Sequence, residues 1–140
     1  MTMKQEIGLV FFAGLLGALV HSFAFFYADE LGLTRYLELN IALDFDKDLL
    51  YQKMIWGGLW GLAYLVVEII SFWPRKYQFI NVVLVSLAPS AFTLFYLFPE
   101  AGKGMLGQNI GEYMFVFVLI MNFIWAISTY IFGKVLGLFK

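Results

Sequence analysis

Glu68 is the residue whose type and position point most directly to chemistry. It is the only acidic or basic residue in an apolar run that extends from residue 54 to residue 73. Ionisable groups inside a membrane are costly and usually face protein or water, so such an acid is a candidate for an ion or proton path. Gly57, Gly61, Tyr64 and Glu68 share one face at helical spacing. That face predicts a close helix contact through its glycines, with Glu68 turned toward the protein interior.

A structural role for Glu68 is the alternative. The residue lies five positions before Trp73, which is roughly 7–8 Å along a helix axis. From there its carboxylate can reach the membrane surface, or it can pair with Arg75 or Lys76. In that case Glu68 stabilises the helix end and takes no part in transport.

His21 is the only histidine and lies in the first apolar run, residues 7–28. It shares a face of small residues with Gly14 and Ala18, which predicts packing against another helix. His21 and Glu68 differ in depth by roughly 13 Å, which allows a shared file of water and excludes a direct hydrogen bond. His21 therefore belongs either to a proton path or to an ordinary hydrogen bond between helices.

Further polar side chains occupy the last apolar run, residues 113–133. Asn122, Ser128 and Thr129 lie level with Glu68 or between the depths of Glu68 and His21. The resulting candidate polar track consists of Glu68, Tyr64, His21, Asn122, Ser128 and Thr129. Such a track fits a narrow conduit, and it equally fits hydrogen bonding between helices. The candidate helix-packing residues are Gly14, Ala18, Gly57 and Gly61.

Membrane-spanning helices must position these residues. Of the 140 residues, 62% are hydrophobic and 14% are charged, whereas a soluble domain is about 45–50% apolar and about 25% charged. Four runs reach the ~20 residues that a spanning helix needs, namely residues 7–28, 54–73, 79–98 and 113–133. We expect an all-α polytopic membrane protein, a four-transmembrane-helix bundle that forms a single domain over residues 1–140. The first run is too long for a signal-peptide core, which indicates a permanent anchor.

The loop at residues 29–53 is long enough to form an element of its own. Leu33, Tyr36, Leu37 and Ile41 recur there at helical spacing. This pattern predicts a short helix on the outer surface or over the mouth of the bundle.

The distribution of basic residues predicts the orientation. Five of the nine Lys and Arg residues lie in the short segments 1–6, 74–78 and 134–140, and the other four lie in the longer loops 29–53 and 99–112. By the positive-inside rule, both termini face the cytoplasm. We expect a multi-pass protein of a cell membrane, of the bacterial inner-membrane type.

The composition also excludes several classes of function. A soluble globular enzyme of this size could not bury this much apolar surface. A net charge of −1 provides no electrostatic attraction to the phosphates of nucleic acid. The chain has no cysteine for a thiolate or a cysteine-held cluster. The acids between Asp44 and Asp48 do not match a calcium loop, because its sixth position is Leu49 instead of glycine. We therefore expect no cofactor and no metal.

Three hypotheses of function follow. The first is a non-catalytic component, either a homo-oligomer or an accessory subunit of a membrane complex, whose partners are the lipid bilayer and itself or another membrane protein. Its support is the two small-residue faces, at Gly14 and Ala18 and at Gly57 and Gly61. The second is a proton or small-cation channel or transporter that uses Glu68. The third is a membrane enzyme acting on a lipid or a quinone.

The orientation can be tested with single cysteines, because the chain has none of its own. A cysteine placed within residues 99–112 should react with a membrane-impermeant maleimide added outside intact cells. One placed within residues 75–77 should react only after the cells are opened. The reverse labelling pattern would overturn the predicted orientation.

Overall fold

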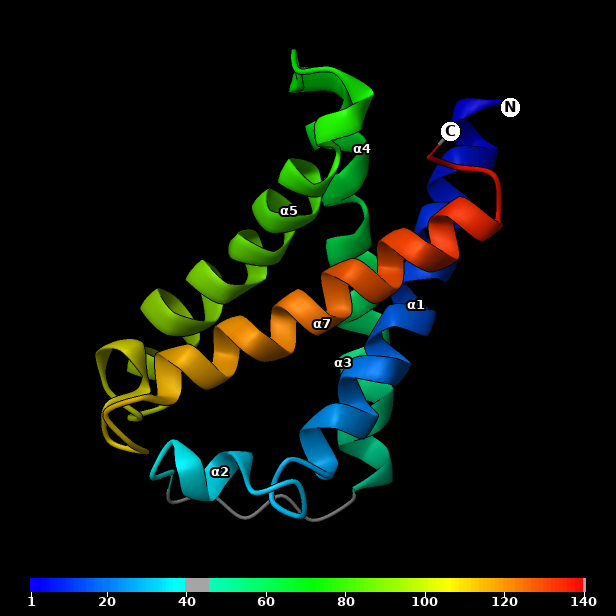
Figure 1. The fold of residues 1–140 in the computed structure, drawn as a ribbon. Coiled ribbons are helices and arrows are strands. Elements are labelled where there is room, and N and C mark those ends of the chain that lie inside the picture. Colours follow the sequence, from blue (N-terminus) through cyan, green and yellow to red (C-terminus); the bar gives the residue numbers. More distant parts are fainter. Residues whose placement is uncertain (40–45, 140) are drawn as a thin grey trace.

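The computed structural model describes residues 1–39 and 46–139, and within these ranges every regular element is helical (Figure 1). The main helices are α1 (Met3–Phe26), α2 (Leu33–Tyr36), α3 (Lys47–Gly61), α4 (Ala63–Ile70), α5 (Phe79–Phe92), the π-helical η2 (Thr93–Leu97), α6 (Phe98–Glu100) and α7 (Met114–Val135). Two short 3₁₀ turns, η1 (Arg75–Tyr77) and η3 (Met105–Gly107), lie in the connections. The expected all-α architecture with a short loop helix is confirmed.

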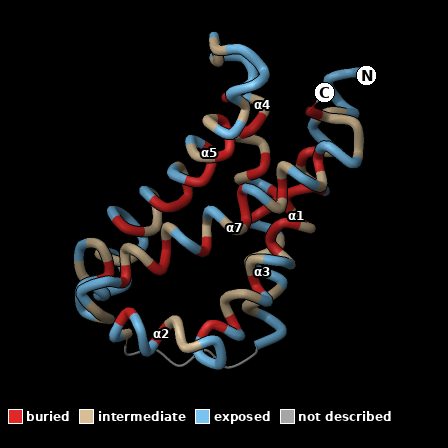
Figure 2. Tube along the Cα trace, viewed as in Figure 1, coloured by how far each residue is buried: buried red, intermediate tan, exposed pale blue. Residues whose placement is uncertain are grey.

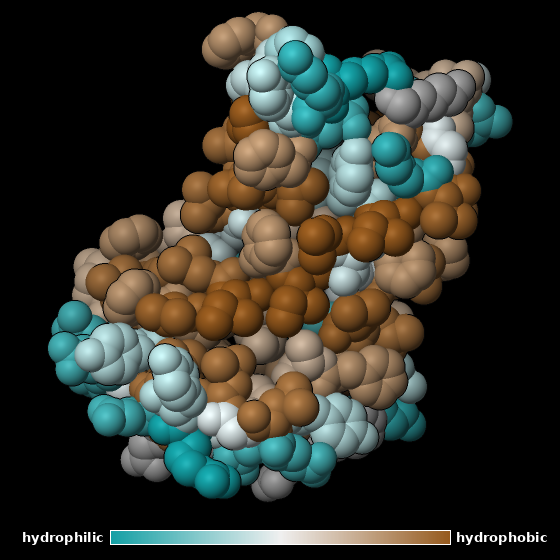
Figure 3. Space-filling model, in the orientation of Figure 1, coloured by the Kyte–Doolittle hydropathy of each residue, from teal (hydrophilic) through white to brown (hydrophobic). Residues whose placement is uncertain are grey.

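Four helical segments are long and apolar enough to cross a membrane. They are Met3–Phe26, Lys47–Ile70, Phe79–Glu100 and Met114–Val135. Hydrophobic residues form a broad band across the molecule, and hydrophilic residues gather at its two ends (Figure 3). The protein is therefore a multi-pass membrane protein. Both termini lie at one end of the bundle, and α2 lies at the other (Figure 1).

Capping residues explain where the first two spans begin. The Thr2 side chain accepts a hydrogen bond from the Gln5 backbone, and the Gln5 side chain accepts one from the Thr2 backbone. Asp46 caps α3, since its Oδ1 accepts the Asp48 N–H at 3.0 Å. The second span thus begins at Lys47, seven residues before the apolar run that starts at residue 54. In the α2 pattern, Ile41 lies outside the described residues.

Close contacts at glycines hold α1 against both α3 and α7. A Cβ atom on Gly57 would lie 2.9 Å from the Gly14 carbonyl oxygen, and one on Gly61 would lie 2.8 Å from the Val10 carbonyl oxygen. On the α7 side, a Cβ atom on Gly17 would lie 3.0 Å from the Thr129 backbone nitrogen. Buried residues lie where these helices cross, and others lie along α5 (Figure 2). These distances leave no room for a side chain, so glycine itself permits the contact.

An aromatic cluster closes the end of the bundle near the termini. Tyr64 is fully buried, and its hydroxyl donates to the Ala126 carbonyl oxygen at 2.5 Å. Its ring packs on Phe139, which in turn stacks on Tyr130 with centroids 5.2 Å apart. Gly137 has a φ of +85°, which allows the chain to reverse after α7 and bring Phe139 back into the core.

We expect Gly61→Leu to destabilise the bundle, because the new side chain would meet the α1 backbone. Overpacking of this kind costs about 1–3 kcal/mol. Gly8→Leu is the matched control, since nothing lies within 4 Å of a Cβ atom at Gly8. Thermal unfolding in mild detergent should show a lower Tm for Gly61→Leu alone. Equal Tm values for the two variants would contradict the close-packing role of Gly61.

Candidate functional site

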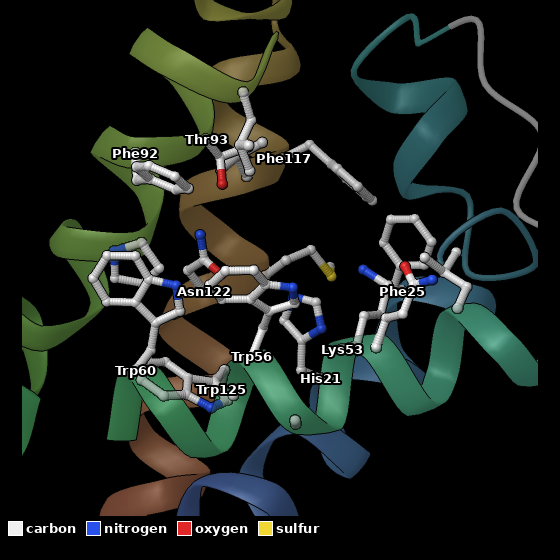
Figure 4. A pocket seen from close by; sticks show the side chains of 18 of the residues that line it. His21, Phe25, Lys53, Trp56, Trp60, Phe92, Thr93, Phe117, Asn122 and Trp125 are labelled. Carbon is white, nitrogen blue, oxygen red and sulfur yellow. The ribbon is translucent and has the colours of Figure 1, made fainter. Parts of the chain in front are cut away.

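A cavity of about 560 Å³ lies between the four spans and is partly open to the outside of the protein (Figure 4). Most of its wall is apolar, and aromatic rings predominate. These rings belong to Phe25, Trp56, Trp60, Phe92, Phe98, Phe117 and Trp125. Ligand pockets in proteins typically measure about 300–1,000 Å³ and have such walls, with a few polar groups that orient the ligand.

The cavity exists because α5 and α3 pack against different helices. The helix α3 packs mainly on α1, whereas α5 packs mainly on α7 and on α4. The Trp60 and Phe92 rings meet with centroids 5.8 Å apart, and they join α3 to α5 at one end of the cavity. Beyond this contact the space between the two helices is lined by side chains from all four spans.

The exposed part of the cavity lining lies on α3 and η2. Of the lining residues, only Gln52, Trp56 and Leu97 are themselves exposed. The first two lie on α3 and the third lies on η2. Both segments belong to membrane-spanning stretches.

A π-helical turn forms the wall opposite α3. Pro89 lacks a backbone N–H and lies inside α5, and η2 begins four residues later at Thr93. Hydrogen bonds fix this region, since Asn122 Nδ2 donates to Ser90 Oγ at 2.9 Å and Ser90 Oγ donates to the Ser86 carbonyl oxygen at 2.8 Å. π-Helical turns are rare and occur frequently at functional sites. Here the turn presents Thr93 and Leu97 to the cavity.

Lys53 places a cation in the cavity. Its Nζ lies 3.8 Å from the centroid of the Phe25 ring, and His21 stacks on the same residue with centroids 6.3 Å apart. The three side chains meet on one wall (Figure 4). Among the described residues, no Asp or Glu lines the cavity. A half-buried cation is costly within a membrane, and a negatively charged group beside it would lower that cost.

The structure separates the residues of the candidate polar track. His21 and Asn122 line the cavity, whereas Glu68, Tyr64, Ser128 and Thr129 do not. The Tyr64 hydroxyl donates its hydrogen bond to the Ala126 carbonyl oxygen instead. Thr129 is buried against Gly17, and among the described residues its Oγ1 has no hydrogen-bond partner.

Glu68 is an exposed residue on α4, the helix near the end of the bundle that carries the termini (Figure 1). Its Oε1 accepts a hydrogen bond from Asn81 Nδ2 at 3.3 Å. The Asn81 Oδ1 in turn accepts the Trp73 indole N–H at 2.9 Å. These contacts join the end of the second span to the start of the third. The other residues on its predicted face, Gly57, Gly61 and Tyr64, are buried.

The packing residues meet one another within a single chain. Gly14 lies against Gly57 and Gly58, and Ala18 lies against Gly57. The Trp125 indole N–H donates to the Gly14 carbonyl oxygen at 3.3 Å and so fills the angle between α1, α3 and α7. The two small-residue faces are thus used between helices of the same bundle.

Sequence reasoning missed Lys53, because the apolar run at 54–73 excluded it from the span and placed it in a loop. A signal was present in the sequence. Asp46 is a favourable N-cap, and a helix that begins there presents Leu49, Lys53, Trp56 and Trp60 on one face. All four residues line the cavity.

The chain matches no protein-family model, no curated protein and no solved structure. Within residues 1–39 and 46–139, no three His, Asp or Glu side chains gather as they would around a metal ion. The arrangement can hold a lipophilic molecule that carries a negative charge.

We expect Lys53→Met to raise the stability of the protein after its lipids have been removed. The change keeps an unbranched stem and removes a cation that is half-buried without a carboxylate among the described residues. Each kcal/mol recovered corresponds to about 2–4 °C in Tm for a chain of this size. Lys47→Met, at an exposed position of the same helix, is the control. A Tm for Lys53→Met at or below that of the control would show that the Lys53 charge is not destabilising.

Proposed function

We propose that this protein is a non-catalytic membrane component that holds a lipophilic anion in the cavity between α1, α3, α5 and α7. The observation that carries the proposal is the position of Lys53, a cation in an aromatic cavity with no carboxylate among the described lining residues. In this proposal a molecule in the bilayer enters between α3 and η2, where the exposed lining residues Gln52, Trp56 and Leu97 lie. The hydrocarbon part would lie against the aromatic wall, with its negative head at Lys53.

The alternative of a proton or small-cation path has less support from the geometry. Glu68 does not line the cavity, and its carboxylate is hydrogen-bonded to Asn81 at one end of the bundle. The charge of Lys53 would repel a cation that entered the cavity. A membrane enzyme acting on a lipid or a quinone would use the same cavity, and a quinone differs from our proposed ligand by its neutral head.

We also propose that the protein self-associates or docks on a larger membrane complex. This contact requires a surface other than the small-residue faces. The small-residue faces that suggested it pack against each other within one chain. Large apolar side chains such as Phe72, Ile69 and Val135 are exposed on the outside of the bundle, where lipid or a partner would cover them.

The cavity can be probed by tryptophan fluorescence, because three of the four tryptophans line it: Trp56, Trp60 and Trp125. A brominated alkyl sulfate, added at increasing mole fraction to the detergent-solubilised protein, should quench this fluorescence in a saturable manner. The matched brominated alcohol should need an about tenfold higher mole fraction, since it cannot pair with Lys53.

Two variants distinguish the contribution of the Lys53 charge to binding from the contribution of the cavity space. Lys53→Gln should reduce the affinity for the sulfate to that for the alcohol, whereas Lys47→Gln should leave it unchanged. Thr93→Phe narrows the cavity without adding a tryptophan, as the Thr93 side chain points into it (Figure 4), and should reduce binding of both probes. Equal affinity for the two heads in the wild-type protein would favour a neutral ligand such as a quinone. Quenching without saturation would contradict a cavity site.

A further inference from the structure

A second hollow, of about 310 Å³, lies on the outside of the bundle between the start of α5 and the end of α7. It shares no lining residue with the cavity described above. One wall comes from η1 and the first turns of α5, and the other comes from one face of α7. We call it the α5–α7 groove.

Positive charge gathers at one end of the α5–α7 groove. Arg75, Lys76 and Lys134 line it, and all three side chains are exposed. No Asp or Glu is present among the described lining residues. Glu68, the acid of α4, is hydrogen-bonded to Asn81, which does not line the groove.

Both walls change from charged to apolar with depth. On α7, the lining residues Lys134, Tyr130, Ile127 and Phe123 follow at helical spacing on one face, over a rise of roughly 16 Å. On the other wall, Phe79 and Val82 follow the basic residues of η1 and continue into the membrane. The aromatic and aliphatic side chains of Phe79, Phe123 and Ile127 are exposed there.

One hydrogen bond holds the two walls at the boundary between these zones. The Tyr130 hydroxyl donates to Gln78 Oε1 at 2.5 Å and so ties α7 to the start of α5. The Lys134 Nζ lies 5.8 Å from the Tyr130 ring centroid, above this tie. The basic end of the groove is thus fixed by contacts between α5 and α7.

We infer that the α5–α7 groove binds a single phospholipid with an anionic headgroup from the leaflet on the side of the termini. Its phosphate lies beside Lys76 and Lys134, at the end of the groove that Arg75 also lines, and one acyl chain follows Phe79, Ile127 and Phe123 into the membrane. Basic pockets between spanning helices commonly hold acidic lipid headgroups in this way. A water-soluble anion would use only the charged end and leave the apolar walls bare, whereas a phospholipid covers both.

Native mass spectrometry tests the inference in the Lys53→Gln background, which removes the cation of the central cavity. Phosphatidylglycerol should bind as one retained copy with an about tenfold higher affinity than phosphatidylcholine of the same acyl chains. Replacing Arg75, Lys76 and Lys134 together by Gln should abolish this preference. Glycerol phosphate at millimolar concentration should not displace the lipid, because it lacks the acyl chain.

A second triple variant provides the control for total charge. Replacing Arg35, Lys47 and Lys103 by Gln removes the same charge from exposed positions outside the groove, and should leave the preference intact. An equal loss in both triple variants would show a non-specific charge effect and overturn the inference. So would equal binding of the two lipids, or displacement by glycerol phosphate. Every arm of this experiment lacks the Lys53 charge. A negative result for the α5–α7 groove therefore does not contradict the proposed cavity site, and a negative result for the cavity does not contradict the proposed groove site.

Discussion

The close approach of α1 to two other helices is the contact on which the rest of the structure depends. Gly14 meets the Gly57 backbone on α3, and Gly17 meets the Thr129 backbone on α7. Within a bilayer there is little hydrophobic gain from bringing helices together, so packing at small residues and hydrogen bonds must do it. The Trp125 indole bonded to the Gly14 carbonyl oxygen adds such a bond at the crossing. The helix α1 thereby holds both α3 and α7 in position.

The cavity follows from this arrangement. With α3 and α7 both bound to α1, α5 can pack along α7 and touch α4 without lying along α3. The bundle therefore keeps a partly open cavity, whose exposed lining residues include Trp56 and Leu97. Pro89 and the π-helical turn that follows shape the remaining wall. A bundle with all four helices in mutual contact would have no room for Lys53 and no site for a ligand.

Positive charge beside apolar surface is common to both candidate sites. In the cavity the cation is Lys53, in the first half of α3. In the α5–α7 groove the cations lie on η1 and at the end of α7, near the end of the bundle that carries the termini (Figure 1). In both places aromatic side chains line the neighbouring wall, and no carboxylate is found among the described lining residues. Molecules with a negative head and a hydrocarbon tail suit such surfaces, and the membrane around the protein supplies them.

The sequence by itself determined that the chain crosses the membrane with four helices and carries a short helix in its long loop, because apolar runs of spanning length have few other stable conformations. It also marked Gly14 and Gly57 as packing positions and His21 as interior. Only the tertiary structure decided which polar groups meet. Glu68 and His21 both lie on spans, yet one bonds Asn81 at the end of the bundle and the other lines the cavity. Helical spacing fixes the face of a residue on its own helix, whereas the crossing angles and partners of helices depend on contacts among residues far apart in the chain. For that reason the cavity was not contained in any one segment of the sequence, although the helix that begins after Asp46 already placed Lys53 on one face with Trp56 and Trp60.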